Sequence, residues 1–137
     1  MWWIFALLSA FFAALTAIFA KVGIKGVDTD LATAIRTVVI LIIAWGIAFI
    51  RGGAFTINSL SKQNILFLCL SGVATGLSWI FYFKALQLGK VSQVAPVDKM
   101  SVAIAIVLSV IFLGETLDVK TIIGALLIIA GTIVLIY

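Results

Sequence analysis

Five long apolar stretches make up most of this 137-residue chain, and they limit its possible folds more than any other feature. A helix needs about 20 mostly apolar residues to cross a bilayer. Apolar residues make up 65% of the chain and charged residues 10%, whereas soluble domains average about 45–50% and about 25%. This composition excludes a water-soluble globular fold and a disordered chain. Because the stretches are continuously apolar rather than alternating, they also exclude a β-barrel.

The chain is therefore predicted to be an all-α, multi-pass integral membrane protein that forms a single domain over residues 1–137. The first stretch lacks basic leading residues and is longer than the apolar core of a signal peptide, so it is expected to remain as a helix. The expected transmembrane helices comprise residues 2–20, 31–50, 65–84, 94–113 and 121–137.

Capping residues set the expected ends of two helices. Asp30 is the expected N-cap of the second. Pro96 suits the first turn of the fourth, which would put Asp98 near an N-terminus that favours an anion. Lys99 would then point about 100° away around the helix, so the two charges would not face each other. Alternatively, the helix starts near Gly89, and Pro96 interrupts it and exposes backbone groups toward a cavity.

The residue types of the chain do not indicate an enzyme. The chain has no histidine, a single cysteine at Cys69 and five scattered carboxylates, which cannot assemble a catalytic triad, a zinc site or a haem site. We therefore expect no enzyme activity, cofactor or metal. The net charge of +4 is ordinary for a membrane protein and does not indicate nucleic acid binding.

Polar and charged side chains inside the stretches have two interpretations each. Arg36 is the sixth residue of the second expected helix, about 9 Å along its axis. It is either a snorkelling or paired structural residue or a charge that faces a cavity. Trp79 and Tyr82 share a helix face and form either an interfacial aromatic belt, with Lys84 just outside it, or the wall of a solute pocket. Asp98 is either a cap or salt-bridge partner of Arg36 or Lys84, or a functional carboxylate.

Small residues mark faces where helices can approach closely. Gly72 and Gly76 form a G-x-x-x-G pattern, and Gly124 and Gly131 lie seven residues apart on nearly one stripe. We expect these four glycines to serve helix packing or dimerisation.

Basic residues near the helix ends give no clear orientation. With the N-terminus inside, the cytoplasmic side receives three of them and the opposite side four or five. Either the chain inserts one way, or it has dual topology and pairs with an inverted copy of itself. The residues counted inside are Arg51, Lys62 and Lys120; those counted outside are Lys21, Lys25, Lys84 and Lys90, with Lys99 arguable.

Five segments follow one another in an order that is typical of one transporter group: Leu31–Arg36, Gly76–Leu86, Gly89–Lys99, Leu113–Glu115 and Gly124–Gly131. Through them the chain resembles the EamA-type unit of the drug/metabolite transporter superfamily. The resemblance implies a five-helix unit that usually occurs twice per chain as inverted repeats. With one copy, this chain is expected to be one half of such a transporter. The arginine that opens the second helix of the unit falls on Arg36, and Glu115 is expected to be structural or a gating contact.

The resemblance implies secondary, non-ATP transport of small metabolites or drug-like solutes by alternating access, in an antiparallel homodimer of a prokaryotic cytoplasmic membrane. The excess of basic candidates favours anionic or zwitterionic solutes, and Asp98 is the candidate for ion coupling. Two alternatives stay open: a non-transporting membrane subunit, and a half-transporter that requires a different partner chain. The candidate substrate-binding residues are Arg36, Trp79, Tyr82, Lys84, Asp98 and Lys99.

Overall fold

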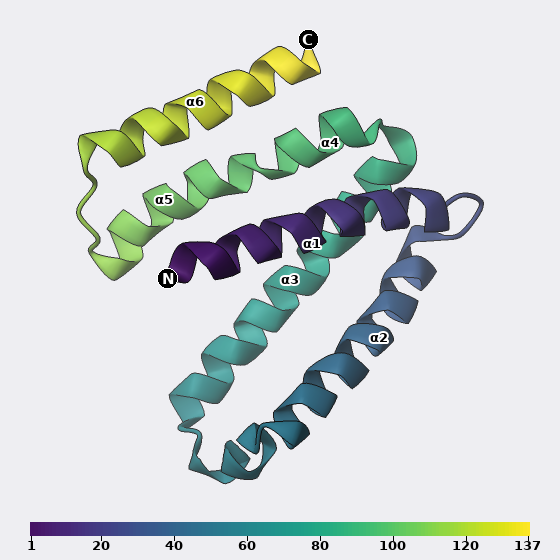
Figure 1. Ribbon diagram of the computed structural model, residues 1–137, viewed down its shortest axis with the longest axis vertical. Coiled ribbons are helices and arrows are strands. Elements are labelled where there is room, and N and C mark those ends of the chain that lie inside the picture. The colour runs from purple at the N-terminus through teal and green to yellow at the C-terminus, as the bar shows by residue number, and fades with distance from the viewer. The chain divides into compact units, whose positions relative to one another are not determined.

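Every apolar stretch is helical in the computed structural model, which describes all of residues 1–137 (Figure 1). Five helical segments are long and apolar enough to cross a membrane, which confirms the prediction of an all-α membrane protein. The fourth of these segments, Val91–Leu113, consists of two consecutive helices. The elements are α1 (Trp2–Gly23), α2 (Thr29–Ile50), the 3-10 helix η1 (Gly53–Ser59), α3 (Lys62–Leu88), α4 (Val91–Asp98), α5 (Met100–Leu113) and α6 (Val119–Ile136).

The chain divides into two compact units. We call Phe19–Gln87 the central unit, and Met1–Ile18 together with Leu88–Tyr137 the terminal unit. The central unit contains α2, η1 and α3, and the terminal unit contains α4, α5 and α6.

In the central unit, α2 begins with a side-chain cap. The Oδ1 atom of Asp28 accepts the backbone N–H groups of Asp30 and Leu31, each at 3.0 Å. The prediction that Asp30 is the cap was therefore wrong, and Asp30 lies in the first turn instead. Both residues are capping types, but only Asp28 has the extended backbone that lets its carboxylate reach the free N–H groups.

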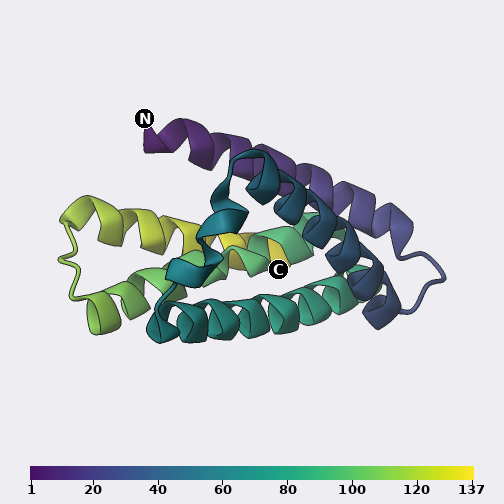
Figure 2. The same cartoon turned by 90° about the horizontal axis from the view of Figure 1, so that it is seen from below.

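The two ends of α3 are fastened differently. At its start, η1 connects it to α2 (Figure 2), and the Ser61 hydroxyl accepts the N–H of Asn64 at 3.1 Å. At its end, the Lys21 ammonium donates to the carbonyl of Leu86, and the Gln87 amide donates to the carbonyl of Val27 at 3.1 Å. The first bond satisfies a backbone carbonyl that the end of α3 leaves open. Together the two bonds hold the end of α3 against the last turn of α1 and the connection that precedes α2.

In the terminal unit, α6 runs beside α4 and α5 (Figures 1 and 2). Gly114 ends α5 with a φ of +67°, a left-handed conformation that glycine adopts without strain. Asp118 then caps α6 by accepting the N–H of Thr121 at 2.9 Å. The resulting hairpin brings Thr132 of α6 to the backbone of α4.

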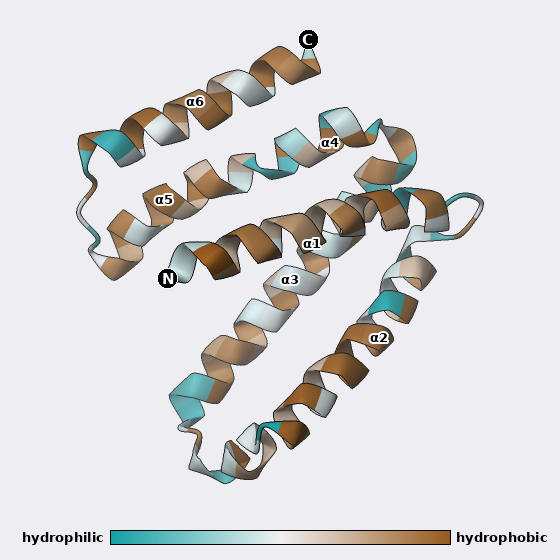
Figure 3. Ribbon diagram, in the orientation of Figure 1, coloured by the Kyte–Doolittle hydropathy of each residue, from teal (hydrophilic) through white to brown (hydrophobic).

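Apolar residues make up most of the long helices, whereas α4 and the helix ends are more polar (Figure 3). Many of the large apolar side chains are exposed on the outside of the chain. In a bilayer these outward side chains meet lipid tails instead of water. Few side chains are buried, and three of them are polar. The buried residues are Ala17, Ala20, Ile24, Phe83, Leu86, Thr29, Thr33 and Thr132.

Candidate functional site

The central unit brings Arg36 of α2 onto an aromatic face of α3. The guanidinium carbon of Arg36 lies 4.1 Å from the centre of the Phe83 ring and 5.8 Å from that of Trp79. Both distances are within the range of cation–π attraction, which contributes about 0.5–2 kcal/mol depending on how dry the site is. The contact offsets part of the cost of holding a cation inside a membrane span.

Helical spacing explains why one arginine meets two rings. Trp79 and Phe83 are four residues apart on α3, so their side chains lie one above the other on the same face. Phe83 is only 1% exposed and is therefore a fixed surface for the guanidinium. Tyr82 packs edge-on against Phe83, with 5.6 Å between ring centres and an interplanar angle of 63°. The α3 face thus supplies an aromatic wall made of Trp79, Tyr82 and Phe83.

The guanidinium of Arg36 keeps an unused hydrogen-bond donor. Its Nη1 atom is buried and has no hydrogen-bond partner. A buried donor without an acceptor costs about 1–3 kcal/mol, and more when it is charged. A group that supplies an acceptor at this position would therefore be stabilised.

The inward side of α2 is polar, which is the reverse of a soluble helix. Its buried residues are Thr29 and Thr33, and Arg36 follows three residues after Thr33 on the same face. The Thr33 hydroxyl donates to the carbonyl of Thr29 at 2.8 Å, so its own helix satisfies that donor. The apolar residues of α2, such as Leu41 and Ile43, point outward. This distribution suits a polar interior surrounded by lipid.

Four of the predicted substrate-binding residues lie in the central unit, where three of them form one cluster and the fourth stays outside it. Arg36, Trp79 and Tyr82 belong to one cluster in the central unit. Lys84 is exposed and takes no part in the contacts of the aromatic wall. Phe83 makes the shortest contact with Arg36 but was not among the predicted site residues. Its spacing of four from Trp79 was the signal that could have found it.

The remaining predicted site residues lie at the break between α4 and α5 in the terminal unit. Asp98 is the last residue of α4, and Lys99 is both the C-cap of α4 and the N-cap of α5. Asp98 therefore lies just before the N-terminus of α5, and the prediction that Pro96 and Asp98 lie in the first turns of the whole fourth span was wrong. The helix starts at Val91 and carries Pro96 inside it, which corresponds to the alternative of an interrupted helix. Pro96 has no N–H to donate to the preceding turn, and the helix ends two residues later, at Asp98.

Asp98 and Lys99 also form an ion pair. The Lys99 ammonium lies 3.4 Å from the Oδ2 atom of Asp98, so the prediction that the two charges do not face each other was wrong. That prediction assumed a continuous helix, in which neighbours diverge by about 100°. The interruption at Lys99 removes this constraint and lets the ammonium fold back onto the carboxylate.

Thr132 connects the break to α6. Its hydroxyl lies 3.2 Å from the carbonyl of Pro96 and 2.8 Å from the carbonyl of Ile128 within its own helix. Thr132 is 3% exposed and is the buried residue of α6. Thr132 is the only residue with a polar side chain between Ile122 and Ile136, which was a weak signal for this contact and did not make Thr132 a predicted site residue.

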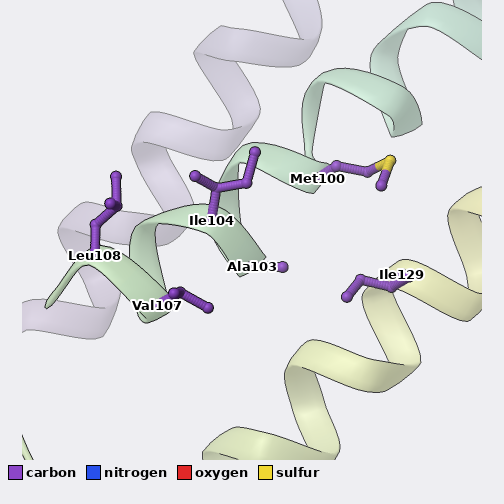
Figure 4. A pocket seen from close by; sticks show the side chains of 6 residues that line it. All are labelled: Met100, Ala103, Ile104, Val107, Leu108 and Ile129. Atoms are coloured by element: carbon purple, nitrogen blue, oxygen red, sulfur yellow. The ribbon is translucent and has the colours of Figure 1, made fainter. Parts of the chain in front are cut away.

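An apolar groove of about 300 Å³ lies between α5 and α6 (Figure 4). Ile129 projects from α6 toward α5 across this groove (Figure 4). No lining side chain carries a hydroxyl, amide or charge, so the groove cannot orient a polar solute. The lining residues are Met100, Ala103, Ile104, Val107, Leu108 and Ile129.

The four glycines assigned to helix packing have free space around them within the chain. A Cβ atom added at Gly72, Gly76, Gly124 or Gly131 would meet nothing within 4 Å. Whether these positions pack against another chain stays a prediction. No group of three or more His, Cys, Asp or Glu residues is placed to hold a metal ion.

Comparison with known proteins places the chain in a family. Residues 1–137 match the EamA-like transporter family over their whole length. The chain belongs to this family. No solved structure matches it significantly.

The relatives differ in length. The "Uncharacterized transporter in cobO 3'region" of Sinorhizobium sp is 47% identical over 134 residues, which cover 98% of this chain and 95% of that protein. The "Uncharacterized transporter YxxF" of Bacillus subtilis is 31% identical over 129 residues, or 93% of this chain and only 40% of that protein. "Uncharacterized protein MJ1333.1" of Methanocaldococcus jannaschii is 38% identical over 77 residues, 56% of each chain. This family therefore includes proteins of similar length and proteins more than twice as long.

Proposed function

We infer that this chain is one half of a secondary transporter, in which two five-helix units of opposite orientation move small metabolites or drug-like solutes by alternating access. Membership of a transporter family supports the transport activity. The inward-facing cluster of Arg36 with Trp79 and Phe83 is the observation that carries the proposal. It puts a charge and an aromatic wall inside the membrane-spanning part of the chain, where polar side chains commonly mark a solute path.

The lengths of the relatives support the half-transporter arrangement. A relative of nearly equal length contains one such unit, whereas a relative of more than twice the length has room for two. Because the unit has five spans, a second copy that follows in the same chain has the opposite orientation. A separate chain reproduces this inverted arrangement only by inserting both ways and pairing antiparallel. We therefore propose a homodimer with dual topology in a prokaryotic cytoplasmic membrane.

Labelling of single cysteines tests the arrangement. Gly53 and Gly89 lie beyond opposite ends of α3, so they belong on opposite sides of the membrane. Gly53→Cys and Gly89→Cys, each in a Cys69→Ala background, are exposed to a membrane-impermeant thiol reagent on intact cells. Labelling of each site in a substantial fraction of molecules supports dual topology. Labelling of one site alone contradicts it and points to a different partner chain. The unsubstituted chain is the control, because its only thiol, Cys69, lies in mid-span.

Reconstitution tests the activity itself. The purified chain in phosphatidylcholine vesicles should release or take up members of a panel of small labelled solutes faster than empty vesicles do. A chain that moves none of them, while being folded and dimeric, would instead be a non-transporting membrane subunit.

A further inference from the structure

The buried Nη1 atom of Arg36 is the least satisfied polar group of the central unit. This one atom of a charged side chain is both buried and without a hydrogen-bond acceptor. Inside a membrane, water does not replace the missing acceptor. We propose that Arg36 binds an oxoanion, meaning a carboxylate or a phosphate, with the aromatic wall of α3 contacting the group that carries it. This inference rests on the proposed function and names the chemical class of ligand for the same site.

Charge decides against a cationic ligand. The guanidinium always carries its positive charge, and the side chains that touch it, Phe83 and Trp79, are uncharged. The carboxylate of Asp28, which directly precedes α2, is engaged in capping that helix through two backbone N–H groups. An organic cation at Arg36 would therefore meet an uncompensated like charge, whereas an anion would neutralise it.

The geometry of the guanidinium favours an oxoanion over a halide or a single carbonyl. The guanidinium carbon lies 4.1 Å from the centre of the Phe83 ring. The N–H donors lie in the plane of the guanidinium, along its edge, and the Nη1 atom among them has no partner. Two oxygens of a carboxylate or phosphate match two such donors side by side, which gives shorter and stronger bonds than a neutral acceptor does.

The ligand has two conceivable sources that share this chemistry. Arg36 lies seven residues after the start of α2 at Thr29, about 10 Å along the helix. A solute carboxylate can reach this depth through a polar path. A lipid phosphate can meet an arginine that extends toward the interface. The experiment below separates the two sources.

Benzoate and benzylammonium are suitable probes, because they share a ring and differ in the sign of their charge. Binding is measured by calorimetry on the unsubstituted chain in phosphatidylcholine vesicles, and by fluorescence on a variant in which Trp79 is the only indole. That variant carries Trp2→Phe, Trp3→Phe and Trp45→Phe. We expect benzoate to bind and to change Trp79 emission, and benzylammonium to bind at least tenfold more weakly.

Arg36→Gln removes the charge and should weaken benzoate binding by about tenfold or more, the loss expected for one charged hydrogen bond. Arg36→Lys keeps the charge without the planar fork and should bind with intermediate affinity. Arg51→Gln is the matched control, since Arg51 is an exposed arginine at the far end of the same helix. It should leave benzoate affinity unchanged. Equal benzoate affinity in the unsubstituted chain and Arg36→Gln would overturn the proposal, as would equal affinity for the two probes.

Lipid composition separates the two sources. A benzoate response in pure phosphatidylcholine supports a solute carboxylate at Arg36. An Arg36-dependent change in Trp79 emission that requires added phosphatidylglycerol supports the phosphate of an anionic lipid. The absence of both responses overturns the proposal.

Measuring solute transport together with benzoate binding distinguishes a failure of the anion site from a failure of the proposed transport function. A chain that transports benzylammonium but does not bind benzoate overturns the anion site and leaves the transport proposal intact. A chain that binds benzoate through Arg36 but moves no solute supports the site and contradicts transport.

Discussion

The hydroxyl of Thr132 in α6 lies 3.2 Å from the carbonyl of Pro96 in α4, three residues before the fourth span is interrupted. It shares its single proton between this carbonyl and that of Ile128 in its own helix. Pro96 is also the residue whose carbonyl accepts the N–H of Lys99 at 3.0 Å. One carbonyl therefore serves the turn and the neighbouring helix together. This arrangement ties the position of the break to α6.

Thr132→Val should loosen the contact between α4 and α6. Valine keeps the shape of threonine but cannot donate, and hydrogen bonds between membrane helices contribute about 0.6 kcal/mol on average. We expect a small loss of thermal stability in detergent and faster hydrogen exchange of the Lys99 amide. Thr37→Val is the matched control, because the Thr37 hydroxyl donates only to Thr33 of its own helix. Equal effects of the two substitutions would show that the link to Pro96 has no special role.

Phe83→Leu should weaken anion binding at Arg36. The substitution keeps an apolar side chain against α2 but removes the ring that holds the guanidinium, a contact of about 0.5–2 kcal/mol. Benzoate affinity should fall between about twofold and thirtyfold. Phe81→Leu, two residues away and 70% exposed, should have no effect. A normal benzoate affinity in Phe83→Leu would contradict a role for the ring.

Asp98→Asn should remove the dependence of transport on a proton or sodium gradient, if Asp98 couples ion movement to solute movement. Asp98 lies at the end of α4 and forms an ion pair with Lys99. A proton or a metal cation that binds the Asp98 carboxylate would compete with this ion pair. The measurement is uptake into vesicles across a range of pH and sodium concentrations. Asp30→Asn, an exposed carboxylate in the first turn of α2, serves as the control. An unchanged pH profile in Asp98→Asn would exclude coupling at this residue.

The cap of α6 predicts a measurable titration shift. The Thr121 hydroxyl and backbone N–H both donate to Asp118 and lower the pKa of its carboxyl from the ordinary value of 3.8. A lowered pKa means that the carboxylate stabilises the folded chain above that value, and that this contribution is lost as the pH falls through the lowered pKa. A carboxyl carbon titration by NMR should give a midpoint below 3.8 for Asp118. Thr121→Val removes the hydroxyl donor and should raise the midpoint. An identical midpoint in Thr121→Val would contradict this assignment.

Gly76→Leu should weaken dimerisation without harming the fold of the single chain. An added side chain at Gly76 meets nothing within the chain, and leucine favours a helix more than glycine does. If this face packs against a second copy, the larger side chain separates the helices, and energy transfer between labelled subunits in vesicles should fall. Gly46→Leu is the control, since Gly46 is another helical glycine with free space around it. Equal energy transfer in both variants would argue against dimerisation through the Gly76 face.

The apolar runs predicted the spans well because lipid imposes one simple requirement, a helix of sufficient apolar length. They predicted the helix ends less well. The third helix, for example, extends over Lys62–Leu88 and exceeds the expected residues 65–84 at both ends. At the membrane surface a helix readily continues through polar residues. The end of an apolar stretch therefore does not mark the end of the helix.

The site was predictable in its residue types but not in its contacts. Arg36 stood out because a charge within a span is costly, and Trp79 and Tyr82 because they share a face. That Phe83 contacts Arg36 depends on how α2 meets α3, which no local pattern specifies. The position of Asp98 within its helix stayed undecided between two alternatives, because a proline fits both the first turn of a helix and an interruption within it.

The outward apolar surface has a consequence for how this sequence can change over time. Side chains such as Ile42, Leu66 and Leu127 are more than half exposed and contact lipid tails, for which one aliphatic side chain serves as well as another. Exchange among leucine, isoleucine, valine and phenylalanine there should be nearly free. Selection then acts on a small minority of inward positions, so a substitution at Thr33 or Phe83 should matter more than many on the surface.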